Sequence, residues 1–359
     1  MKVNGKSYKT LWIENNVVKI IDQTKLPFEL KIIELRELKS FCEAISFMRV
    51  RGAPLIGVTA AFGMAISLSK DPSDINIERS HKELLSTRPT AINLKWAIDI
   101  VKDECIKIDF KLRPRKALKI AKNILKSDLA SCKAIGKHGS KIIEKIYQKK
   151  KKVVNILTHC NAGWLAAIDW GTALAPIFMA KKKKIPMHIW VDETRPRNQG
   201  VLTSWELYNE KIPNTVIVDN AGGHLMKNGL VDLCIVGSDR TTINGDVCNK
   251  IGTYLKALAA FDNKIPFYVA LPSSTIDRNM KTNKNNIQIE ERSSTEISHI
   301  KSLENNEVKN IRIFPKEVKT YNPAFDVTPS KMITSLITEH GLCIAKRSEI
   351  VKILKKQKI

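Results

Sequence analysis

The sequence has no uninterrupted apolar run of the roughly 18 residues that a membrane-spanning helix needs. Its longest apolar stretch, residues 53–68, is interrupted by Pro54, Gly57 and Gly63, and such a stretch is typical of a buried core helix. No apolar segment follows Met1, so the N-terminus lacks the pattern of a secretory signal. We therefore expect neither membrane association nor secretion.

Cysteine is scarce and irregularly spaced. The cysteines are odd in number, include no C-x-x-C pair and do not form a four-ligand zinc pattern. These features exclude a disulfide framework and are typical of a cytoplasmic protein with reduced thiols. The seven residues are Cys42, Cys105, Cys132, Cys160, Cys234, Cys248 and Cys343.

Motifs for common cofactors and metals are absent as well. The chain contains no G-x-G-x-x-G, no H-E-x-x-H and no G-x-S-x-G motif. Its seven histidines form no spaced ligand cluster. We therefore expect no nucleotide cofactor and no catalytic metal.

Charge of one sign is in excess, because 60 Lys and Arg against 36 Asp and Glu give a net charge of +24. The lysines are scattered and form no basic stripe interleaved with aromatic residues, the pattern that RNA-binding proteins use. The runs at 149–152 and 181–184 each follow a helical pattern, where cations complement the helix dipole. We expect no nucleic-acid partner, while the positive charge would attract a small anionic substrate.

A length of 359 residues predicts about two domains. The first, residues 1–126, begins with β-branched and aromatic segments and continues with helical periodicity. The polar stretch 70–88 is predicted to be a long connection. The predicted strands are 10–13, 17–21 and 28–35, and the predicted helices are 38–48, 54–69, 91–107 and 115–126.

The second predicted domain, residues 127–359, alternates short apolar runs with helical segments, as parallel strands joined by crossover helices do. The predicted class is α/β, with a small N-terminal strand-plus-helix domain followed by a doubly wound, mainly parallel Rossmann-like sheet domain. The polar residues 281–310 are predicted to form a surface excursion. The predicted strands are 153–157, 185–191, 215–218, 233–236 and 266–271, and helices end near 180 or span 201–209, 221–228 and 250–261.

Polar segments follow all five of these predicted strands. In an open α/β sheet, ligands bind beyond the carboxyl ends of the strands. Each segment alone is compatible with an ordinary turn, but five of them at one sheet edge predict a single polar site. The segments are 158–163, 192–200, 219–224, 237–246 and 272–275.

Two residues in these segments have the chemistry of a catalytic site. Cys160 lies in a loop ahead of a helical segment, where a helix N-terminus and cations lower the pKa of a thiol. Asp239 follows the fourth strand, beside Arg240. In a dry pocket the Asp239 carboxyl would be a proton donor at neutral pH, whereas an ion pair with Arg240 would keep it ionised and structural. The sequence leaves both alternatives open.

Two arginines are candidates for binding a phosphate. Arg51 precedes Gly52, Ala53 and Pro54 at the start of the apolar helical stretch, where free backbone N–H groups bind anions. Arg88 occupies a similar place before the next helical segment. A guanidinium adds a bidentate contact to such a site.

At these residues the chain resembles the methylthioribose-1-phosphate isomerases, in the superfamily shared with the regulatory subunits of eukaryotic translation initiation factor 2B. The similarity extends over nearly the whole chain, and its polar blocks coincide with the strand-end segments described above. The matching blocks are 51–54, 88–94, 158–163, 192–196, 199–200, 219–222, 237–240, 249–253 and 322–329.

The resemblance implies a homodimeric aldose–ketose isomerase without a cofactor or metal. It would convert 5-methylthioribose 1-phosphate to 5-methylthioribulose 1-phosphate in methionine salvage. The implied catalytic residues are Cys160 and Asp239. The implied substrate contacts are Arg51, Gly52, Ala53, Arg88, Gln199, Asn249 and Lys250. The polar segment 281–310 is not expected to touch the chemistry.

Two other functions stay open. One is isomerisation of 5-deoxyribose 1-phosphate or ribose 1,5-bisphosphate, and the other is a non-catalytic regulatory subunit. For the isomerase, Asp239 would protonate the ring oxygen. The Cys160 thiolate would then take the C2 proton, or a hydride would pass directly from C2 to C1 while Cys160 keeps the site apolar.

Overall fold

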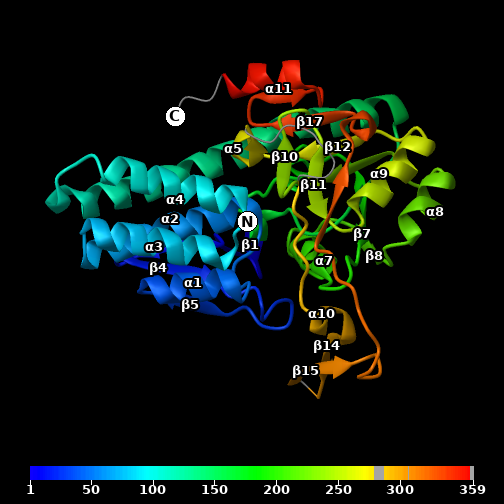
Figure 1. Ribbon diagram of the computed structural model, residues 1–359. Helices are drawn as coiled ribbons and strands as arrows, with labels where there is room; N and C mark the ends of the chain where they lie inside the picture. The colour runs from blue at the N-terminus through cyan, green and yellow to red at the C-terminus, as the bar shows by residue number, and fades with distance from the viewer. Residues whose placement is uncertain (279–286, 306, 356–359) are drawn as a thin grey trace.

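The first third of the chain packs helices over a small antiparallel sheet, drawn in blue and cyan in Figure 1. The computed structural model describes residues 1–278, 287–305 and 307–355. The sheet has the order β3-β4-β5, formed by Leu11–Glu14, Val17–Ile21 and Ile32–Leu35. Asn15 and Asn16 both have positive φ, as a tight hairpin turn between β3 and β4 requires.

The third strand is shorter than predicted. Residues 28–31 do not join it, because the backbone N–H groups of Phe28 and Glu29 bond back to the Lys25 carbonyl in a turn. A separate hairpin, β1 (Lys2–Val3) and β2 (Lys6–Ser7), precedes the sheet.

Helix α2 (Ala53–Lys70) is the centre of the N-terminal core. Within the described ranges it is the one helix long and apolar enough to cross a membrane, and 78% of it is buried inside the protein. It packs against α1 (Leu38–Ser46), α3 (Asp74–Thr87), α4 (Ile92–Cys105) and the long helix α5 (Arg113–Lys150). The apolar stretch 53–68 is therefore a core helix, as predicted.

The prediction of a connection over 70–88 is wrong, because α3 occupies most of it. Ser73 caps the helix by accepting a hydrogen bond from the Asn76 N–H, and Asp74 lies in its first turn. Ile77, Ser80 and Leu84 are buried at helical spacing. This stripe is narrow, and polar residues around it hide the periodicity in the sequence.

Helix α5 continues well past the predicted 115–126 segment. It contacts α2 and α4 in the N-terminal core and also α6 (Ala175–Lys182) and β6 (Val154–Thr158) of the large sheet. The helix therefore runs across the predicted boundary between residues 126 and 127, and the division of the chain there stays a prediction.

The large sheet has seven strands in the order β18-β17-β12-β9-β6-β7-β8. All neighbouring pairs are parallel except β17 and β18, which confirms a doubly wound, mainly parallel sheet. Figure 1 shows this sheet on the other side of the molecule from α1–α4. The remaining strands are β7 (Met187–Asp192), β8 (Asn214–Ile217), β9 (Leu233–Val236), β12 (Phe267–Ala270), β17 (Ser335–Thr338) and β18 (Gly341–Cys343).

The strand order reverses between β6 and β9. The chain passes from β6 outward through β7 to β8 and then returns to place β9 on the other side of β6. Loops that leave neighbouring strands in opposite directions open a crevice, and ligands of doubly wound sheets bind there. Cys160 follows β6 and Asp239 follows β9, so this crevice lies between the two residues predicted to be catalytic.

A second sheet of four strands, in the order β13-β10-β11-β16, was not predicted. Its strands are only two to four residues long, too short for a period-2 pattern to emerge. They are β10 (Arg240–Thr242), β11 (Val247–Lys250), β13 (Ile276–Asp277) and β16 (Phe325–Thr328). The hairpin of β14 (His299–Glu304) and β15 (Glu307–Arg312) extends away from the body of the molecule (Figure 1).

The remaining helices connect and cover the strands. They are α7 (Gln199–Asn209), α8 (Ala221–Lys227), α9 (Thr253–Asp262), α10 (Thr295–Ser298) and α11 (Arg347–Leu354), with short 3₁₀ turns at Phe110–Leu112, Trp164–Ala166, Ser273–Thr275 and Ser330–Met332.

The Asp128 side chain on α5 bonds to the backbone of Ile168, in the segment between β6 and α6. Its Oδ2 accepts the Ile168 N–H at 2.9 Å, and the Cys132 thiol donates to its Oδ1 at 3.8 Å. Burial raises the pKa of Asp128 to about 7. The folded protein therefore holds this proton up to higher pH than the unfolded chain, and stability decreases between about pH 4 and pH 7 as the unfolded chain loses it.

We expect Asp128→Asn to stabilise the protein at pH 8 by about 2 kcal/mol, since it removes a buried charge while the amide oxygen takes the place of Oδ2 and accepts the Ile168 N–H. At pH 4 the variant and the wild type should unfold at nearly the same denaturant concentration, because Asp128 is then protonated. Urea unfolding at the two pH values measures both. An equal effect at both pH values would contradict the assignment of a buried, titrating carboxyl.

Candidate active site

One cavity lies at the crevice between the β6 and β9 loops and reaches the start of α2. It has a volume of about 100 Å³. All nine residues predicted for the site line it, although they come from distant parts of the sequence. These are Arg51, Gly52, Ala53, Arg88, Cys160, Gln199, Asp239, Asn249 and Lys250.

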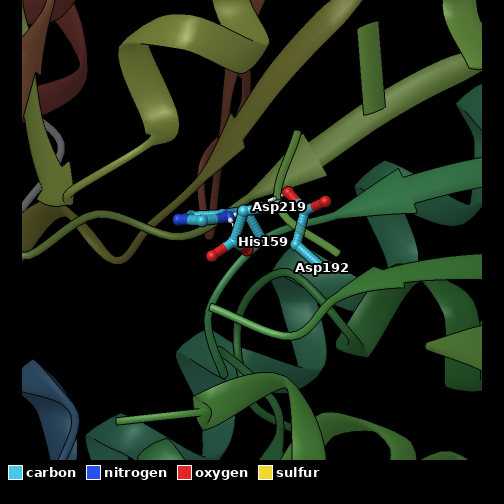
Figure 2. A group of neighbouring side chains, drawn as sticks. All are labelled: His159, Asp192 and Asp219. Carbon is cyan, nitrogen blue, oxygen red and sulfur yellow. Dashed lines mark hydrogen bonds and ion pairs between the residues drawn. The ribbon is translucent and has the colours of Figure 1, made fainter. Parts of the chain in front are cut away.

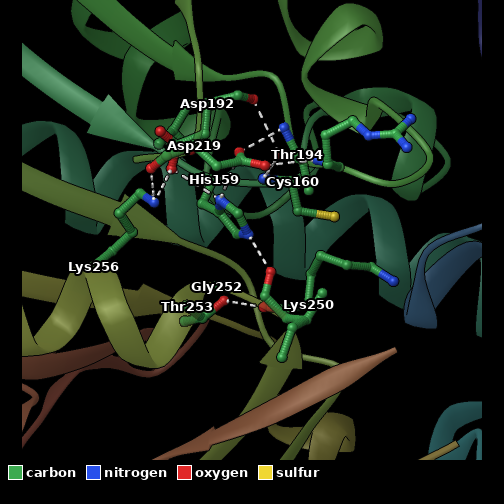
Figure 3. Close-up of polar contacts among 12 residues, drawn as sticks. His159, Cys160, Asp192, Thr194, Asp219, Lys250, Gly252, Thr253 and Lys256 are labelled. Atoms are coloured by element: carbon green, nitrogen blue, oxygen red, sulfur yellow. Dashed lines mark hydrogen bonds and ion pairs between the residues drawn. The ribbon is translucent and has the colours of Figure 1, made fainter. Parts of the chain in front are cut away.

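Cys160 is held in a left-handed backbone conformation with φ of 66°. Its N–H donates to Thr194 Oγ1 at 2.9 Å, and its carbonyl accepts from Thr203 Oγ1 at 2.8 Å. Figure 3 shows the Cys160 thiol and the Lys250 amino group extending in the same direction, one from the loop after β6 and the other from the end of β11. Two hydrogen bonds to the backbone of Cys160 thus fix the direction of its side chain.

The expectation of an acidic Cys160 thiol is wrong. Residues 164–166 form only a 3₁₀ turn, and α6 begins at residue 175, so no α-helix N-terminus adjoins the thiol. Burial raises the pKa of Cys160, and the nearby charges of Lys250 and Arg51 oppose this only in part. The thiol form therefore predominates at neutral pH.

Asp239 is not paired with Arg240. The Arg240 guanidinium donates to the Thr90 carbonyl at 2.7 Å and lies 3.9 Å from Asp277 Oδ2. Among the residues that the structure describes, nothing hydrogen-bonds to the Asp239 carboxyl. Burial raises the pKa of Asp239, opposed by the charges of Lys250 and Arg88. This matches the dry-pocket alternative, in which the carboxyl keeps a proton to higher pH.

Two buried cations face the cavity, and neither has a counter-ion among the residues that the structure describes. Arg51 is only 9% exposed, and its Nε and Nη2 have no acceptor in the described part of the chain. Lys250 is 7% exposed, and its amino group lies 5.0 Å from the centre of the Phe325 ring. Burial lowers the pKa of Lys250. Buried charge that lacks a partner is costly, so this arrangement favours an anionic ligand.

Arg88 contacts a residue of the polar segment 281–310, which was not predicted to lie near the site. Its Nη2 is 3.4 Å from Glu290 Oε2, while Glu290 Oε1 accepts from Arg292 at 2.6 Å. Arg292, together with Ile287 and Gln288, lines the cavity. The prediction that 281–310 is only a surface excursion is therefore wrong for residues 287–292, and residues 281–286 lie outside the described ranges.

The other predicted contacts are fixed by backbone geometry. Gly52 has φ of +92°, and a Cβ there would come within 2.4 Å of the Ala166 carbonyl, so only glycine allows α2 to begin this close to the β6 loop. Gln199 is the first residue of α7, and its Oε1 has no partner among the described residues. Asn249 lies in β11, where its Nδ2 donates to Thr253 Oγ1 at 3.0 Å.

The helix predicted over 250–261 begins only at Thr253. Asn249 and Lys250 instead end strand β11, which pairs with β16. Pairing of Lys250 with Phe325 across these strands places the ring beside the Lys250 amino group.

Behind the cavity, the strand-end loops are joined by a buried polar cluster (Figure 2). His159 Nδ1 lies 2.9 Å from Asp192 Oδ2, and its Nε2 lies 2.8 Å from the Ile251 carbonyl oxygen. Lys256 contributes a cation 3.3 Å from Asp192 Oδ2. Asp219 accepts the backbone N–H groups of Thr194 and Arg195 at 2.8 and 2.7 Å.

His159, Asp192 and Asp219 bring one nitrogen and two carboxylates close enough to hold a metal ion. However, Lys256 already supplies the positive charge, and both His159 nitrogens are engaged. Figure 3 shows this cluster beside Cys160 and Lys250. Its role in the geometry is to connect the loops after β6, β7, β8 and β11.

Sequence reasoning did not select Asn161, Arg292 or Phe325, which also line the cavity. Asn161 lies beside Cys160 in a segment already singled out, so its position was a usable signal. Phe325 lies in the 322–329 block that carries the family resemblance, which was also a usable signal. Arg292 comes from a segment with no strand-end pattern, and only the tertiary fold places it here.

Comparison with known proteins matches residues 49–344 to the Initiation factor 2 subunit family. Methylthioribose-1-phosphate isomerase from Escherichia coli O45:K1 (strain S88 / ExPEC) is 53% identical to this chain, over 98% of this chain and 95% of that protein. Two solved structures are also similar. They are 5-methylthioribose 1-phosphate isomerase from Pyrococcus horikoshii OT3 (TM-score 0.83, 35% identity, 98% and 97% coverage) and the translation initiation factor eIF-2B, subunit delta, from A. fulgidus (TM-score 0.79, 34% identity, 97% and 100% coverage).

We expect Arg51→Gln to weaken the binding of inorganic phosphate at least tenfold, because it removes a buried, unpaired guanidinium from the cavity. The same change should raise the melting temperature without phosphate, since an uncompensated charge is lost. Calorimetric titration and thermal melts with and without phosphate measure both effects.

Arg49→Gln is the matched control. Arg49 is partly exposed and lies 3.7 Å from Glu43 in a surface pair, so its loss should change neither quantity. If phosphate stabilised Arg51→Gln as strongly as the wild type, Arg51 would not be an anion ligand.

Proposed function

This chain belongs to the Initiation factor 2 subunit family, and we propose that it is an aldose–ketose isomerase of methionine salvage. It converts 5-methylthioribose 1-phosphate to 5-methylthioribulose 1-phosphate. The observation that carries the proposal is the cavity at the β6–β9 crevice, where two unpaired buried cations face the same space as a protonatable carboxyl and a thiol. The name of the relative with 53% identity over nearly the full length supports the same reaction.

The two cations have the chemistry to bind the substrate phosphate. Arg51 offers unused guanidinium donors, and Lys250 adds a second buried charge. A phosphate on C1 prevents the sugar from opening to a free aldehyde, so the enzyme must break the ring by another route. Protonation of the ring oxygen is that route.

Asp239 supplies this proton. Its carboxyl faces the cavity, and its raised pKa favours the protonated form that a general acid needs. As the ring oxygen takes the proton, its bond to C1 breaks and C1 becomes electron-deficient. The C2 hydrogen then passes to C1 with its bonding pair, and the C2 hydroxyl returns a proton to the Asp239 carboxylate as C2 becomes the ketone. One proton enters and one leaves, so the step balances.

Burial of Cys160 favours this direct hydride shift over proton abstraction. A general base at this position would have to be a thiolate, and burial raises the pKa of Cys160. As a neutral thiol the side chain contributes an apolar wall beside the reacting carbons. The positive charge that develops on C1 is then screened less than it would be beside a polar side chain.

Two alternatives have weaker support. A sugar with a second phosphate, ribose 1,5-bisphosphate, would need further free cations, whereas Arg292 is occupied by Glu290 and Glu296. A non-catalytic regulatory role agrees with the delta-subunit name of one similar structure, at 34% identity. The presence of both Cys160 and Asp239 in one cavity favours catalysis.

We also propose a cytoplasmic homodimer without a nucleic-acid partner, divided into domains at residues 126 and 127. Free thiols at all seven cysteines agree with a reducing compartment. On the side of α9 away from the core, Leu255, Leu258 and Phe261 are 57%, 41% and 58% exposed at helical spacing. An exposed apolar row of this kind suits contact with a second copy of the chain.

The proposed activity is tested with purified protein and three sugars: 5-methylthioribose 1-phosphate, 5-deoxyribose 1-phosphate and ribose 1,5-bisphosphate. We expect the highest kcat/KM for the methylthio sugar. Asp239→Asn should lower kcat by about 10²–10⁴-fold with little change in substrate binding, because the amide cannot donate the proton. In the wild type, kcat/KM should fall as pH rises through the pKa of Asp239.

Cys160→Ser and Arg49→Gln are the controls for this assay, one inside the cavity and one outside it. Loss of turnover in the first alone places the reaction in the cavity. Preference for another sugar would keep the mechanism and change the pathway, and no turnover on any sugar would favour the regulatory role.

Turnover in deuterium oxide distinguishes the two mechanisms. A direct shift carries the C2 hydrogen to C1, so we expect no solvent deuterium at C1 of the product. Proton NMR or mass spectrometry of the product measures this. Wash-in of about one deuterium at C1 would instead require a base, with Cys160 as the first candidate.

A further inference from the structure

Asn161 carries a buried hydrogen-bond acceptor that nothing in the described residues satisfies. Its side chain is only 5% exposed and lines the cavity next to Cys160. The Oδ1 atom has no partner. Buried polar atoms are nearly always hydrogen-bonded in folded proteins, so an unpaired one at the wall of a ligand cavity calls for a partner from the ligand.

The orientation of the Asn161 amide is determined by its neighbours on α7. Its Nδ2 lies 2.8 Å from Glu206 Oε1 and 3.1 Å from Thr203 Oγ1. Thr203 uses its only proton on the Cys160 carbonyl, so its oxygen can only accept from the amide. Glu206 Oε1 also accepts the Leu165 N–H, and Oε2 accepts the Trp164 N–H. An amide turned the other way would place its oxygen against Thr203 Oγ1, which has no further proton to donate, and against the ionised form of Glu206.

The carboxylate of Glu206 is itself immobile. It is fully buried, and a Cβ on Gly163 would come within 1.9 Å of its Oε2, so the β6 loop closes tightly over it. The amide of Asn161 therefore cannot exchange its nitrogen and oxygen without breaking two hydrogen bonds. Its Oδ1 is therefore the amide atom that is left without a hydrogen bond in the described structure.

We propose that Asn161 Oδ1 accepts a hydrogen bond from a ring hydroxyl, at C2 or C3, of the sugar phosphate, and that Glu206 is the positioning residue for this contact. The proposal rests on the proposed function. A carbonyl oxygen repels a phosphate, which Arg51 and Lys250 attract, and it selects a neutral donor such as a hydroxyl. Different residues of the cavity thus bind the two parts of the substrate: Arg51 and Lys250 bind the phosphate, and Asn161 binds the ring hydroxyl.

The test pairs removal of the amide with removal of each hydroxyl. The probes are 5-methylthioribose 1-phosphate, its 3-deoxy analogue as a substrate and its 2-deoxy analogue as a competitive inhibitor. For the wild type we measure kcat/KM with the first two and the inhibition constant of the third. The same values are measured for Asn161→Ala, Asn161→Ser and the control Asn209→Ala. The Asn209 amide donates to the Trp205 carbonyl outside the cavity.

We expect Asn161→Ala to lower kcat/KM for the complete sugar by about 10–100-fold, within the range for one buried hydrogen bond to a neutral group. For the analogue that lacks the contacted hydroxyl, the same substitution should change kcat/KM (3-deoxy sugar) or the inhibition constant (2-deoxy sugar) less than threefold. Wild-type protein should disfavour that analogue by a similar factor, a comparison that needs no variant to fold. Asn209→Ala should leave all three sugars unaffected.

Glu206→Gln tests the positioning role. A glutamine there presents an N–H₂ group to donors or to the amide, so the Asn161 amide is no longer held in one orientation. We expect this variant to lose part of the discrimination against the same analogue, while kcat/KM for the 3-deoxy sugar, or the inhibition constant of the 2-deoxy sugar, stays unchanged for the analogue that lacks the contacted hydroxyl. A general structural fault would weaken the use of all three sugars alike and leave the discrimination intact.

Equal losses for all three sugars in Asn161→Ala, or a wild type that accepts both deoxy analogues as well as the complete sugar, would overturn the proposal. Absence of wild-type turnover on the complete sugar is a different result, because it contradicts the proposed function itself.

Discussion

The buried positive charge of Arg51 and Lys250 is the constraint on which the site depends. Neither side chain has a counter-ion in the described structure, and both face the cavity that Cys160 and Asp239 share. The fold must therefore stabilise this charge by other means until an anion binds. The Phe325 ring beside the Lys250 amino group is one such contact. The charges also limit how far burial raises the pKa of Cys160 and Asp239.

Rigidity of the strand-end loops is the second requirement. The cluster of His159, Asp192, Asp219 and Lys256 joins loops from four strands, while Glu206 holds the loop after β6 from the opposite side. Preorganised groups stabilise developing charge without moving during the reaction. The residues that touch substrate and those that hold them in place thus occupy two successive layers of the same crevice.

Much of the architecture could be predicted because its elements are long and regular. The core helix α2 and the five alternating strands followed from apolar periodicity, and the strand ends in the sequence indicated Cys160 and Asp239. Helix α3 was missed because its buried stripe of Ile77, Ser80 and Leu84 is narrow and partly polar. The four-stranded sheet was missed because strands of two to four residues carry no readable pattern. The prediction of a lowered pKa for the Cys160 thiol was wrong because burial raises this pKa more than the neighbouring cations lower it, and burial is not a local property of the sequence.

The sequence by itself determined the fold class and which residue types stand at the carboxyl ends of the strands, because both follow from local periodicity and strand direction. Only the tertiary structure decided that Arg240 does not pair with Asp239, that Glu290 pairs with Arg88, and that the Asn161 amide points one way. These properties depend on contacts between residues tens to hundreds of positions apart. No local pattern encodes the distance between such groups or the water excluded around them, and these two quantities determine the chemistry of the cavity.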